Sequence, residues 1–317
     1  MNAKVYIHNG AQLLAPAVQQ GVEWITERKG VPGKLTFSAL RDSLLDVSEG
    51  NPVSLHVDGK PAFKGFIFRI SGDKGPLVKI TAYDQMRYLK NKDTYVFDPA
   101  KASEIIRMIA EDYGLELGEI ADTGYTIPGR VEDNTTLLDM MQTALELTLT
   151  NTRNLYVLYD DAGKLTLKNA ADMYIGLLLD EQSAENYSRD TSIDEETYNR
   201  VKLVYEDEKS GKRKVYISED AENQKKWGTL QLFESISGKE NAQSKADMLL
   251  KLYNTPKGSL KISGALGDMR VRAGCFAMVK LADAGADNFM LVESCRHRFE
   301  NGRHSMDLTL KGGDFSG

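Results

Sequence analysis

The sequence predicts a mainly β protein of the α+β class, with two small tube-like antiparallel β-barrel domains and a helical or mixed segment between them. Short runs of alternating apolar and polar residues, separated by glycine- and proline-rich turns, fill the first 97 residues and the last third. Helical periodicity is concentrated in between. With 317 residues, 41% of them hydrophobic, the chain can bury two or three cores. We therefore expect domains at 1–97, 98–196 and 197–317, the last interrupted by a helix at about 239–254.

The N-terminal domain is predicted from five short strands at 22–25, 34–39, 53–57, 66–70 and 77–83. Asp58-Gly59 is a strong signal for a two-residue hairpin turn. In the return strand, Phe66, Phe68 and Ile70 fall on one face because side chains alternate along a strand. Closely spaced antiparallel strands of this kind are typical of a small barrel or sandwich.

The middle segment begins with a helix, for which Asp98 is a suitable cap and Pro99 a suitable first residue. Apolar residues then follow helical spacing up to Gly114, which we expect to end the helix. A second helix is predicted to start near 134–135, and a hairpin follows at 155–159 and 165–167. The acidic stretch 180–196 is predicted to be a surface loop with one or two strands.

The last third returns to β structure. Residues 201–205 are expected to pair with 215–217, and Ser237 to Glu240 form a capping box that opens the helix. Further strands are predicted at 260–264, 271–281, 289–299 and 305–311.

Composition excludes several functions. The net charge of −6 argues against a general nucleic-acid binder, which needs basic surface. No apolar run reaches the roughly 18 to 20 residues of a membrane-spanning helix, and the first residues lack the pattern of a signal peptide. Two cysteines are too few for a disulfide scaffold, so we expect synthesis in a reducing cytoplasm.

Motifs for catalysis are absent from the sequence. It has no phosphate-binding loop, dinucleotide fingerprint, nucleophile elbow or H-E-x-x-H. We predict no enzyme activity, no cofactor and no metal. Cys295, His297 and His304 are conceivable metal ligands, but structural zinc takes four, and a hairpin with polar, partly exposed side chains is favoured. Carboxylate pairs such as Asp160-Asp161 are interpreted as solvated turn residues.

Several stretches resemble one family. ITAYDQMRYLKNKDTYVFD, ASEIIRMIAEDYGLELGEIADTGY, TSIDEETYNRVKLVYED and VESCRHRFENGRHSMDLTL resemble the hub proteins of contractile phage baseplates, of the XkdQ/YqbQ type found in PBSX-like prophages and related to late control D-type hubs. The resemblance spans nearly the whole chain and is weakest before Val22 and across 173–189.

The resemblance implies a structural function. Such hubs are homotrimers in which each chain supplies two barrels, so that a pseudo-sixfold ring joins the hexameric tail tube to the trimeric spike. Tube protein, spike protein and other baseplate proteins, including LysM-bearing ones, would be the partners. The chain would be made in the bacterial cytoplasm and assembled into a phage, a prophage particle or a tail-like bacteriocin.

Two alternatives stay open: a tail-associated peptidoglycan hydrolase and a host-surface binding module. Polar loops at 180–194 and 218–226 are the expected partner contacts. The candidate contact residues are Asp180, Glu185, Arg189, Asp194, Glu219, Lys225 and Lys226.

Overall fold

The computed structural model describes residues 1–317 except 11, 42–45, 195–196, 207–211, 237–240 and 313–317. The chain divides into two compact units. Unit 1 comprises Met1–Ser188 and Leu260–Gly317, and unit 2 comprises Arg189–Ser259. Strands dominate both units, which confirms the predicted mainly β, α+β class. Among the described residues, no helix has the length and apolar character needed to cross a bilayer.

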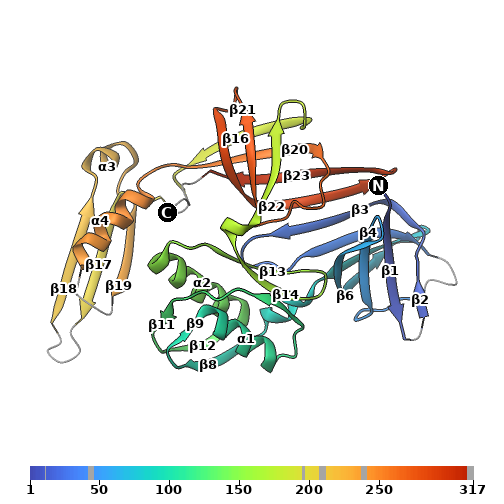
Figure 1. Ribbon diagram of the computed structural model, residues 1–317, viewed down its shortest axis with the longest axis horizontal. Coiled ribbons are helices and arrows are strands. Elements are labelled where there is room, and N and C mark those ends of the chain that lie inside the picture. Colours follow the sequence, from blue (N-terminus) through green and yellow to red (C-terminus); the bar gives the residue numbers. More distant parts are fainter. Residues whose placement is uncertain (11, 42–45, 195–196, 207–211, 237–240, 313–317) are drawn as a thin grey trace. The chain divides into compact units, whose positions relative to one another are not determined.

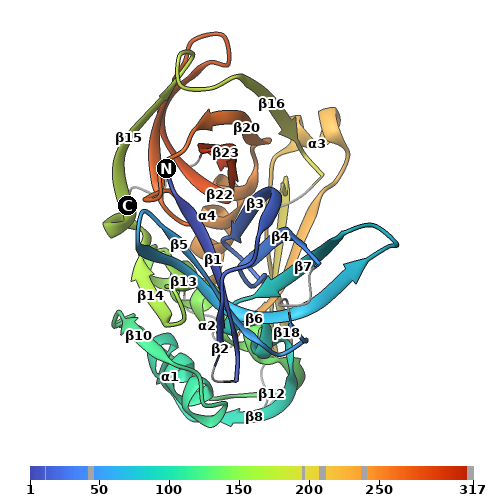
Figure 2. The same ribbon diagram turned by 90° about the vertical axis from the view of Figure 1, so that its right-hand side faces the viewer.

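Two groups of strands build most of unit 1 (Figures 1 and 2). The N-terminal β module contains β1 Ala3–Asn9, β2 Gln12–Leu14, β3 Val18–Glu27, β4 Lys34–Leu40, β5 Pro52–Val57, β6 Lys60–Gly72 and β7 Leu77–Tyr83. The C-terminal β module contains β15 Tyr174–Asp180, β16 Asn186–Ser192, β20 Lys257–Leu266, β21 Phe276–Leu281, β22 Ala286–Glu300 and β23 Arg303–Lys311. The N-terminal module lies within the first 97 residues, where the sequence predicts β structure. The C-terminal module combines strands of the predicted last third with β15 and β16, which come from the predicted middle segment. Strands β16 and β20 cross the division between the units, which falls after Ser188 and after Ser259.

One continuous sheet joins the two modules. Its strand order is β16-β20-β23-β22-β3-β4-β7-β6-β5-β1-β2, and β15 and β21 continue from β22 as a branch. The modules meet where β22 pairs antiparallel with β3, with His297 opposite Trp24 and Phe299 opposite Val22. β15 and β21 are an exception to the antiparallel pattern because they run parallel.

Alternation along the strands selects the core of the N-terminal module. Leu35, Phe37 and Ala39 of β4 are buried, as the predicted strand at 34–39 requires. In β6 the core face carries Phe63 and Ile67. Phe66 and Phe68 are only partly buried, and both rings contact Tyr88. The predicted shared face of Phe66, Phe68 and Ile70 is therefore wrong for Ile70. Phe66 and Phe68 lie on the outer face of the strand, whereas Ile70 follows a register shift between Ile67 and Arg69 and packs against the core.

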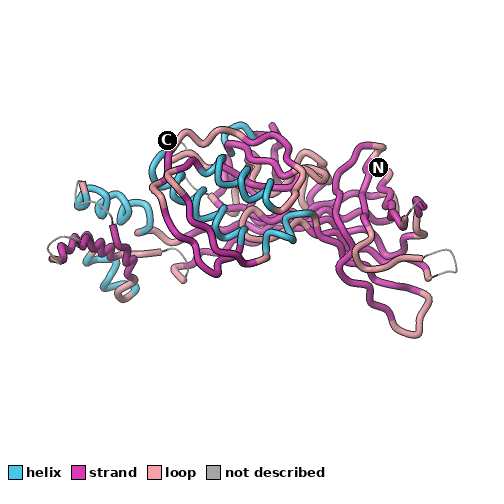
Figure 3. The backbone as a smooth tube through the Cα atoms, turned by 90° about the horizontal axis from the view of Figure 1, so that it is seen from below, coloured by secondary structure: helices cyan, strands magenta, loops and turns pink. Residues whose placement is uncertain are grey.

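The middle segment packs two helices around its own core. Its elements are η1 Gln85–Lys90, β8 Lys92–Phe97, β9 Ala100–Lys101, α1 Ala102–Asp112, β10 Leu117–Ile120, β11 Thr126–Ile127, β12 Arg130–Thr136, α2 Leu137–Thr152, β13 Tyr156–Asp160, β14 Leu165–Asn169 and η2 Ala170–Met173. The apolar faces of α1 and α2 line this core. Figure 3, which shows the helices in cyan, lets the reader follow them.

The predicted start of α1 is wrong by several residues. Asp98 and Pro99 do not cap it, because Ala100 and Lys101 first pair with β11 as strand β9. The carboxylate of Glu104 instead accepts a hydrogen bond from the Lys101 amide, 2.7 Å away. The predicted end is confirmed, since Gly114 has φ +64°, a left-handed conformation that glycine tolerates. α2 begins after Thr136, whose hydroxyl accepts from the Asp139 amide.

Unit 2 is a three-stranded sheet with one packed helix. It contains β17 Arg200–Glu206, β18 Arg213–Glu219, α3 Ala221–Trp227, β19 Gln231–Ile236 and α4 Ala242–Tyr253, in the order β18-β17-β19. Val201 and Leu203 meet Ala246 and Leu249 of α4 in its core. The predicted hairpin is confirmed, with Val204 opposite Val215. The predicted capping box at 237–240 lies outside the described residues.

These divisions differ from the predicted domain boundaries. The predicted C-terminal domain at 197–317 contains both the core of unit 2 and most of the C-terminal β module. β15, predicted within the middle segment, pairs with β21 of that module. Pairings about 100 residues apart in the sequence leave no local periodicity, so the pattern of the sequence does not reveal them.

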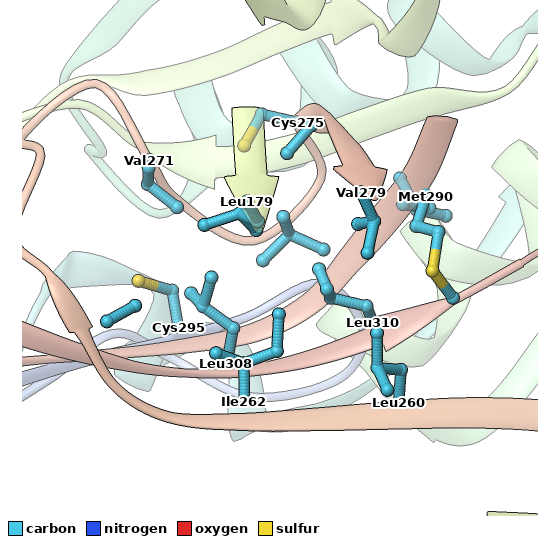
Figure 4. Packing of buried hydrophobic residues seen from close by; sticks show 14 of the residues in the cluster. Leu179, Leu260, Ile262, Val271, Cys275, Val279, Met290, Cys295, Leu308 and Leu310 are labelled. Carbon is cyan, nitrogen blue, oxygen red and sulfur yellow. The ribbon is translucent and has the colours of Figure 1, made fainter. Parts of the chain in front are cut away.

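The C-terminal module has the largest apolar cluster (Figure 4). Leu179, Val279, Leu308 and Leu310 come from three strands and are at most 2% exposed. The predicted strand at 271–281 begins only at Phe276. Val271 and Cys275 precede it in a turn, yet both are buried in the same cluster. These two residues are apolar because they are buried, although they are not part of a strand.

A buried polar network joins the two β modules to the middle segment. Asp84, directly after β7, accepts hydrogen bonds from the amides of Gly33 (2.8 Å) and Met86 (3.0 Å). Asp160, at the end of β13, accepts from the Gln85 side-chain amide (2.8 Å) and the Gly163 amide (2.6 Å). The prediction that Asp160 is a solvated turn residue is wrong, because it is only 6% exposed.

Arg272, from the turn before β21, supplies the cation of this network. Its guanidinium donates to the Asp160 carbonyl oxygen at 2.8 Å and lies 3.6 Å from the centre of the Tyr159 ring. Burial, and then the charge of Asp160, raise the pKa of Asp84 well above its ordinary value of 3.8. Burial also raises the pKa of Asp160. The positive charge of Arg272 acts in the opposite direction and lowers the pKa of both carboxyl groups. We call Asp84, Gln85, Asp160 and Arg272 the junction network.

Replacement of Arg272 by methionine should destabilise unit 1 strongly. Two buried carboxylates would lose their nearby cation, a change that costs on the order of 3–5 kcal/mol when one partner of a buried ion pair is removed. Urea denaturation of the Trp227→Phe background measures this, because the remaining Trp24 lies in unit 1. Arg270→Met is the matched control, since its exposed pair with Asp268 should contribute less than about 1 kcal/mol. Equal losses for the two variants would contradict this account.

Asp84→Asn should change stability in a pH-dependent way. The pKa of Asp84 is higher in the folded state than in the unfolded state, so ionised Asp84 destabilises the folded wild-type protein. This loss of folding stability is complete at a pH above the folded-state pKa. It disappears as the pH falls through the folded-state pKa toward the ordinary value of 3.8. Urea denaturation measures the free energy of unfolding of both proteins. The value for the variant minus the value for wild type should therefore be more positive at pH 8 than at pH 5. Asp93→Asn is the control, because the Tyr113 hydroxyl lowers the Asp93 pKa below its ordinary value of 3.8, so its stability difference should not change between pH 5 and pH 8. A pH-independent difference for Asp84→Asn would refute the assignment.

Candidate assembly site

The predicted contact residues are divided between the two units. Asp180 and Glu185 belong to unit 1. Asp180 is half-buried at the end of β15, where its carboxylate accepts from the amides of Gln182 (3.1 Å) and Ser183 (3.0 Å). It therefore holds a turn and is a poor candidate for a partner contact. Glu185 is exposed in the connection before β16.

The other five residues belong to unit 2. Arg189 and Asp194 are exposed in and after β16. Glu219 lies at the end of β18 and pairs with Arg200 at 3.5 Å. Lys225 and Lys226 are exposed on α3, and Lys225 pairs with Glu222 at 2.9 Å. The predicted residues thus do not form a single cluster within one compact unit.

An exposed apolar patch on the C-terminal module was missed by sequence reasoning. It consists of Tyr174, Leu178 and Phe289, which are 55%, 47% and 52% exposed. Leu178 and Phe289 flank Met278 across three adjacent strands, and the Tyr174 and Phe289 rings meet edge-to-face at 5.2 Å. The only sign of this patch in the sequence was the run of apolar residues at 174–179. An apolar run as long as a strand does not show which of its residues face solvent. Contiguous exposed apolar residues of this kind mark interaction surfaces.

The large sheet of unit 1 also has open ends. β2 is the edge strand at one end of the strand order, and β16 is the edge strand at the other end. β15 is the edge strand of the branch that continues through β21. Edge strands present unpaired backbone donors and acceptors that can pair with another chain. The C-terminal patch includes two residues of β15, so apolar surface and an open edge coincide there.

The histidine cluster has a structural geometry. His297 Nε2 lies 2.9 Å from the Val271 carbonyl oxygen, so that nitrogen carries the proton and donates. His297 Nδ1 must then accept from His304 Nε2, also at 2.9 Å. Burial lowers the pKa of His297 to about 3, so the ring is neutral at physiological pH. Its ring stacks on Trp24 at 4.9 Å, across the pairing of β22 with β3.

This cluster corrects the sequence prediction of partly exposed side chains. His297 and Cys295 are both 0% exposed, and Cys295 Sγ lies 3.2 Å from His297 Nε2. In the part of the chain that the structure describes, no group of three His, Cys, Asp or Glu side chains is arranged to hold a metal. His297 is a neutral hydrogen-bonding group within the β22–β3 pairing that joins the two β modules, and His304 of the neighbouring strand β23 donates to it.

Comparison with known proteins agrees with this architecture. A family model described as YQBQ-like matches residues 22–311. The phage-like element PBSX protein XkdQ of Bacillus subtilis strain 168 is 32% identical over 270 residues, which cover 83% of this chain and 82% of that protein. The uncharacterized protein YqbQ of the same strain is 31% identical over 288 residues, 89% of this chain and 87% of that protein.

A solved structure shows the same fold. The 43 kDa tail protein of prophage MuSo2 from Shewanella oneidensis superposes with a TM-score of 0.71 at 11% identity, covering 97% of this chain and 98% of that chain. Fold similarity at this identity extends over both units of the present chain. The predicted resemblance to proteins of the XkdQ/YqbQ type is confirmed, and the chain belongs to the YqbQ-like family.

Proposed function

We propose that the protein is the structural hub of a contractile tail baseplate, a homotrimeric adaptor between a hexameric tail tube and a trimeric spike. The observation that carries the proposal is the single sheet in which β3 and β22 join two β modules of one chain. Three such chains bring six β modules together with threefold symmetry. This is the arrangement that a sixfold tube and a threefold spike require of an adaptor.

The surface of unit 1 supports the same proposal. An open sheet is incomplete at β2, β15 and β16, and its apolar patch of Tyr174, Leu178 and Phe289 faces solvent in the single chain. A ring of copies would cover such a patch and pair such edges. The family relationship to a protein of a phage-like element, and the fold shared with a prophage tail protein, agree with assembly into a particle.

The proposed partners are further copies of the chain, the tube protein, the spike protein and other baseplate proteins, including LysM-bearing ones. The chain would be made in the bacterial cytoplasm and act within an assembled particle. Its role would be structural, without catalysis, because the side chains of Asp84, Asp160, Arg272 and His297 make hydrogen bonds that hold the modules together.

The trimer is testable by mass. Light scattering after gel filtration should give about three times 35.3 kDa, alone or as a three-to-three complex with the spike protein. Leu178→Glu should lower the trimer fraction, because the charge would be desolvated in the contact. Met108→Glu, at a similarly exposed apolar residue of α1, is the control and should leave the mass unchanged. A strict monomer under both conditions would contradict the hub assignment.

The charged loops can be tested in the particle. Alanine substitution of Glu185, Arg189 and Asp194, or of Glu219, Lys225 and Lys226, should lower the yield of assembled particles without changing the thermal unfolding of the chain. Surface charges away from special features contribute little to stability, so loss of yield would report lost partner contacts. A block of exposed charges elsewhere, Lys90, Lys92 and Glu111, is the control. Unchanged yield for both test blocks would remove these loops from the contact surface.

A further inference from the structure

The outer face of a two-stranded ribbon in the middle segment exposes two valines. Among the described strands, β8 and β12 pair only with each other. Val96 and Val131 lie directly opposite one another in this pair and are 75% and 65% exposed. On the inner face Phe97 is buried, and the Tyr95 hydroxyl donates to Asp112 of α1 at 2.8 Å. The valines therefore belong to no core, and two adjacent apolar side chains with this exposure are a candidate interaction surface.

Carboxylates lie at both ends of the valine pair. On β12, Asp133 follows Val131 by two residues and accepts a hydrogen bond from the Thr94 hydroxyl at 2.7 Å, which holds it on the outer face. After β8, exposed Asp98 follows Val96 by two residues. Because the strands are antiparallel, the two carboxylates lie on opposite sides of the valine pair. Four residues of extended chain span the distance between them, which is about 13 Å along the ribbon.

The cations of the ribbon do not neutralise this face. Arg130 lies on the inner face, over the Phe97 ring, and pairs with Glu132 at 3.0 Å. Lys92 lies at the start of β8, beyond Asp133. Around the valines, where the structure describes every residue of both strands, the charged groups of the outer face are thus carboxylates.

The composition of the middle segment has the same bias. Residues 84–173 contain 16 of the 46 Asp and Glu of the chain but only 9 of its 40 Lys and Arg. The rest of the chain is nearly neutral, so the net charge of −6 comes from this segment. Such an asymmetry of charge favours a partner of opposite sign.

We propose that the outer face of β8 and β12 binds a basic, extended segment of another protein. The segment carries basic residues at positions i and i+4 and an apolar residue at i+2, because alternate side chains of an extended chain lie on one side. Its apolar side chain covers Val96 and Val131, and its two cations reach Asp98 and Asp133. Since the chain is proposed to act in a baseplate, the partner is another baseplate protein, and the contact rests on the proposed function. Each chain of the homotrimer presents the face once, so three segments bind per hub.

A second copy of the same face is a poor occupant. Both ends of the face carry a carboxylate, so a contact between two copies that is centred on the valines brings carboxylates together whichever way the two ribbons run. Like charges in such positions oppose association. Charge complementarity therefore selects a basic partner over a further copy of this chain.

Photo-crosslinking in the assembled particle tests the contact. Val131 is replaced by p-benzoylphenylalanine, and irradiation should join this chain to a different particle protein. Mass spectrometry of the cross-linked peptide should find a basic–x–apolar–x–basic sequence in that protein. The same replacement of Met108, an exposed apolar residue of α1 in the same segment, is the control and should not give this product.

Charge reversal tests the two carboxylates. In the background with the cross-linker at Val131, the double variant Asp98→Lys and Asp133→Lys should lower the product by about tenfold or more, because like charges then meet. The milder pair Asp98→Asn and Asp133→Asn should lower it less and make it insensitive to salt. Glu49→Lys with Glu111→Lys, at exposed carboxylates elsewhere in unit 1, should leave the product unchanged. Unchanged thermal unfolding of each purified variant separates a lost contact from a folding defect.

Two kinds of failure can be distinguished. If the wild-type chain is absent from the particle, the proposed function fails, and this contact fails with it. If the chain is present but position 131 gives no product, or a product only with another copy of this chain or with an acidic segment, the contact is refuted while the hub assignment stands. A product that survives both pairs of substitutions would refute the contact as well.

Discussion

The antiparallel pairing of β22 with β3 is the interaction on which the architecture of unit 1 depends. It makes one sheet out of two β modules by pairing two strands that lie more than 250 residues apart in the sequence. A row of aromatic and imidazole rings reinforces the seam, since His297 stacks on Trp24 and lies near Phe299 and His304. Because His297 donates to Val271 and accepts from His304, the ring also ties the turn before β21 to the hairpin of β22 and β23.

The junction network performs the same task for the middle segment with charges. Two buried carboxylates, a buried glutamine and a partly buried arginine meet where residues after β7, at the end of β13 and before β21 converge. Desolvation opposes the ionisation of the carboxylates, as the raised pKa values of Asp84 and Asp160 show. Apolar residues could provide more stability at such a place, but hydrogen bonds with fixed donors and acceptors specify one relative position of the packed elements. In the proposed trimer, in which every copy must present the same surfaces, that specificity would be useful.

The two units differ in how they would meet other chains. Unit 1 has open sheet edges and an apolar patch beside β15, features that suit extension of a sheet into a ring. In unit 2, α4 covers one side of the sheet. On the other side, Phe233, Val215 and Ile217 are exposed, and the ion pairs Arg200–Glu219 and Glu206–Arg213 lie at the two ends of the strands. Sequence polarity alone directed attention to charged loops. In assembly, the apolar surfaces would contribute more than the charged loops, because burial of apolar area supplies most of the free energy of association.

The sequence by itself determined the class of the fold and most of its elements. Period-two patterns at 34–39 and 77–83 and the helical spacing before Gly114 are local properties, and each appears in the structure. Family membership could also be predicted from the sequence, because stretches that resemble the family occur in the same order along the chain and can be compared without a structure. Burial of Asp160 and His297 was not visible, since Gln85 and Val271, their respective partners, are brought to them by folding. The pairing of β15 with β21, the separation of unit 2 and the exposed side of each sheet also depend on long-range contacts. Only the tertiary structure could decide them, because periodicity shows that a strand has two faces and not which of them another element covers.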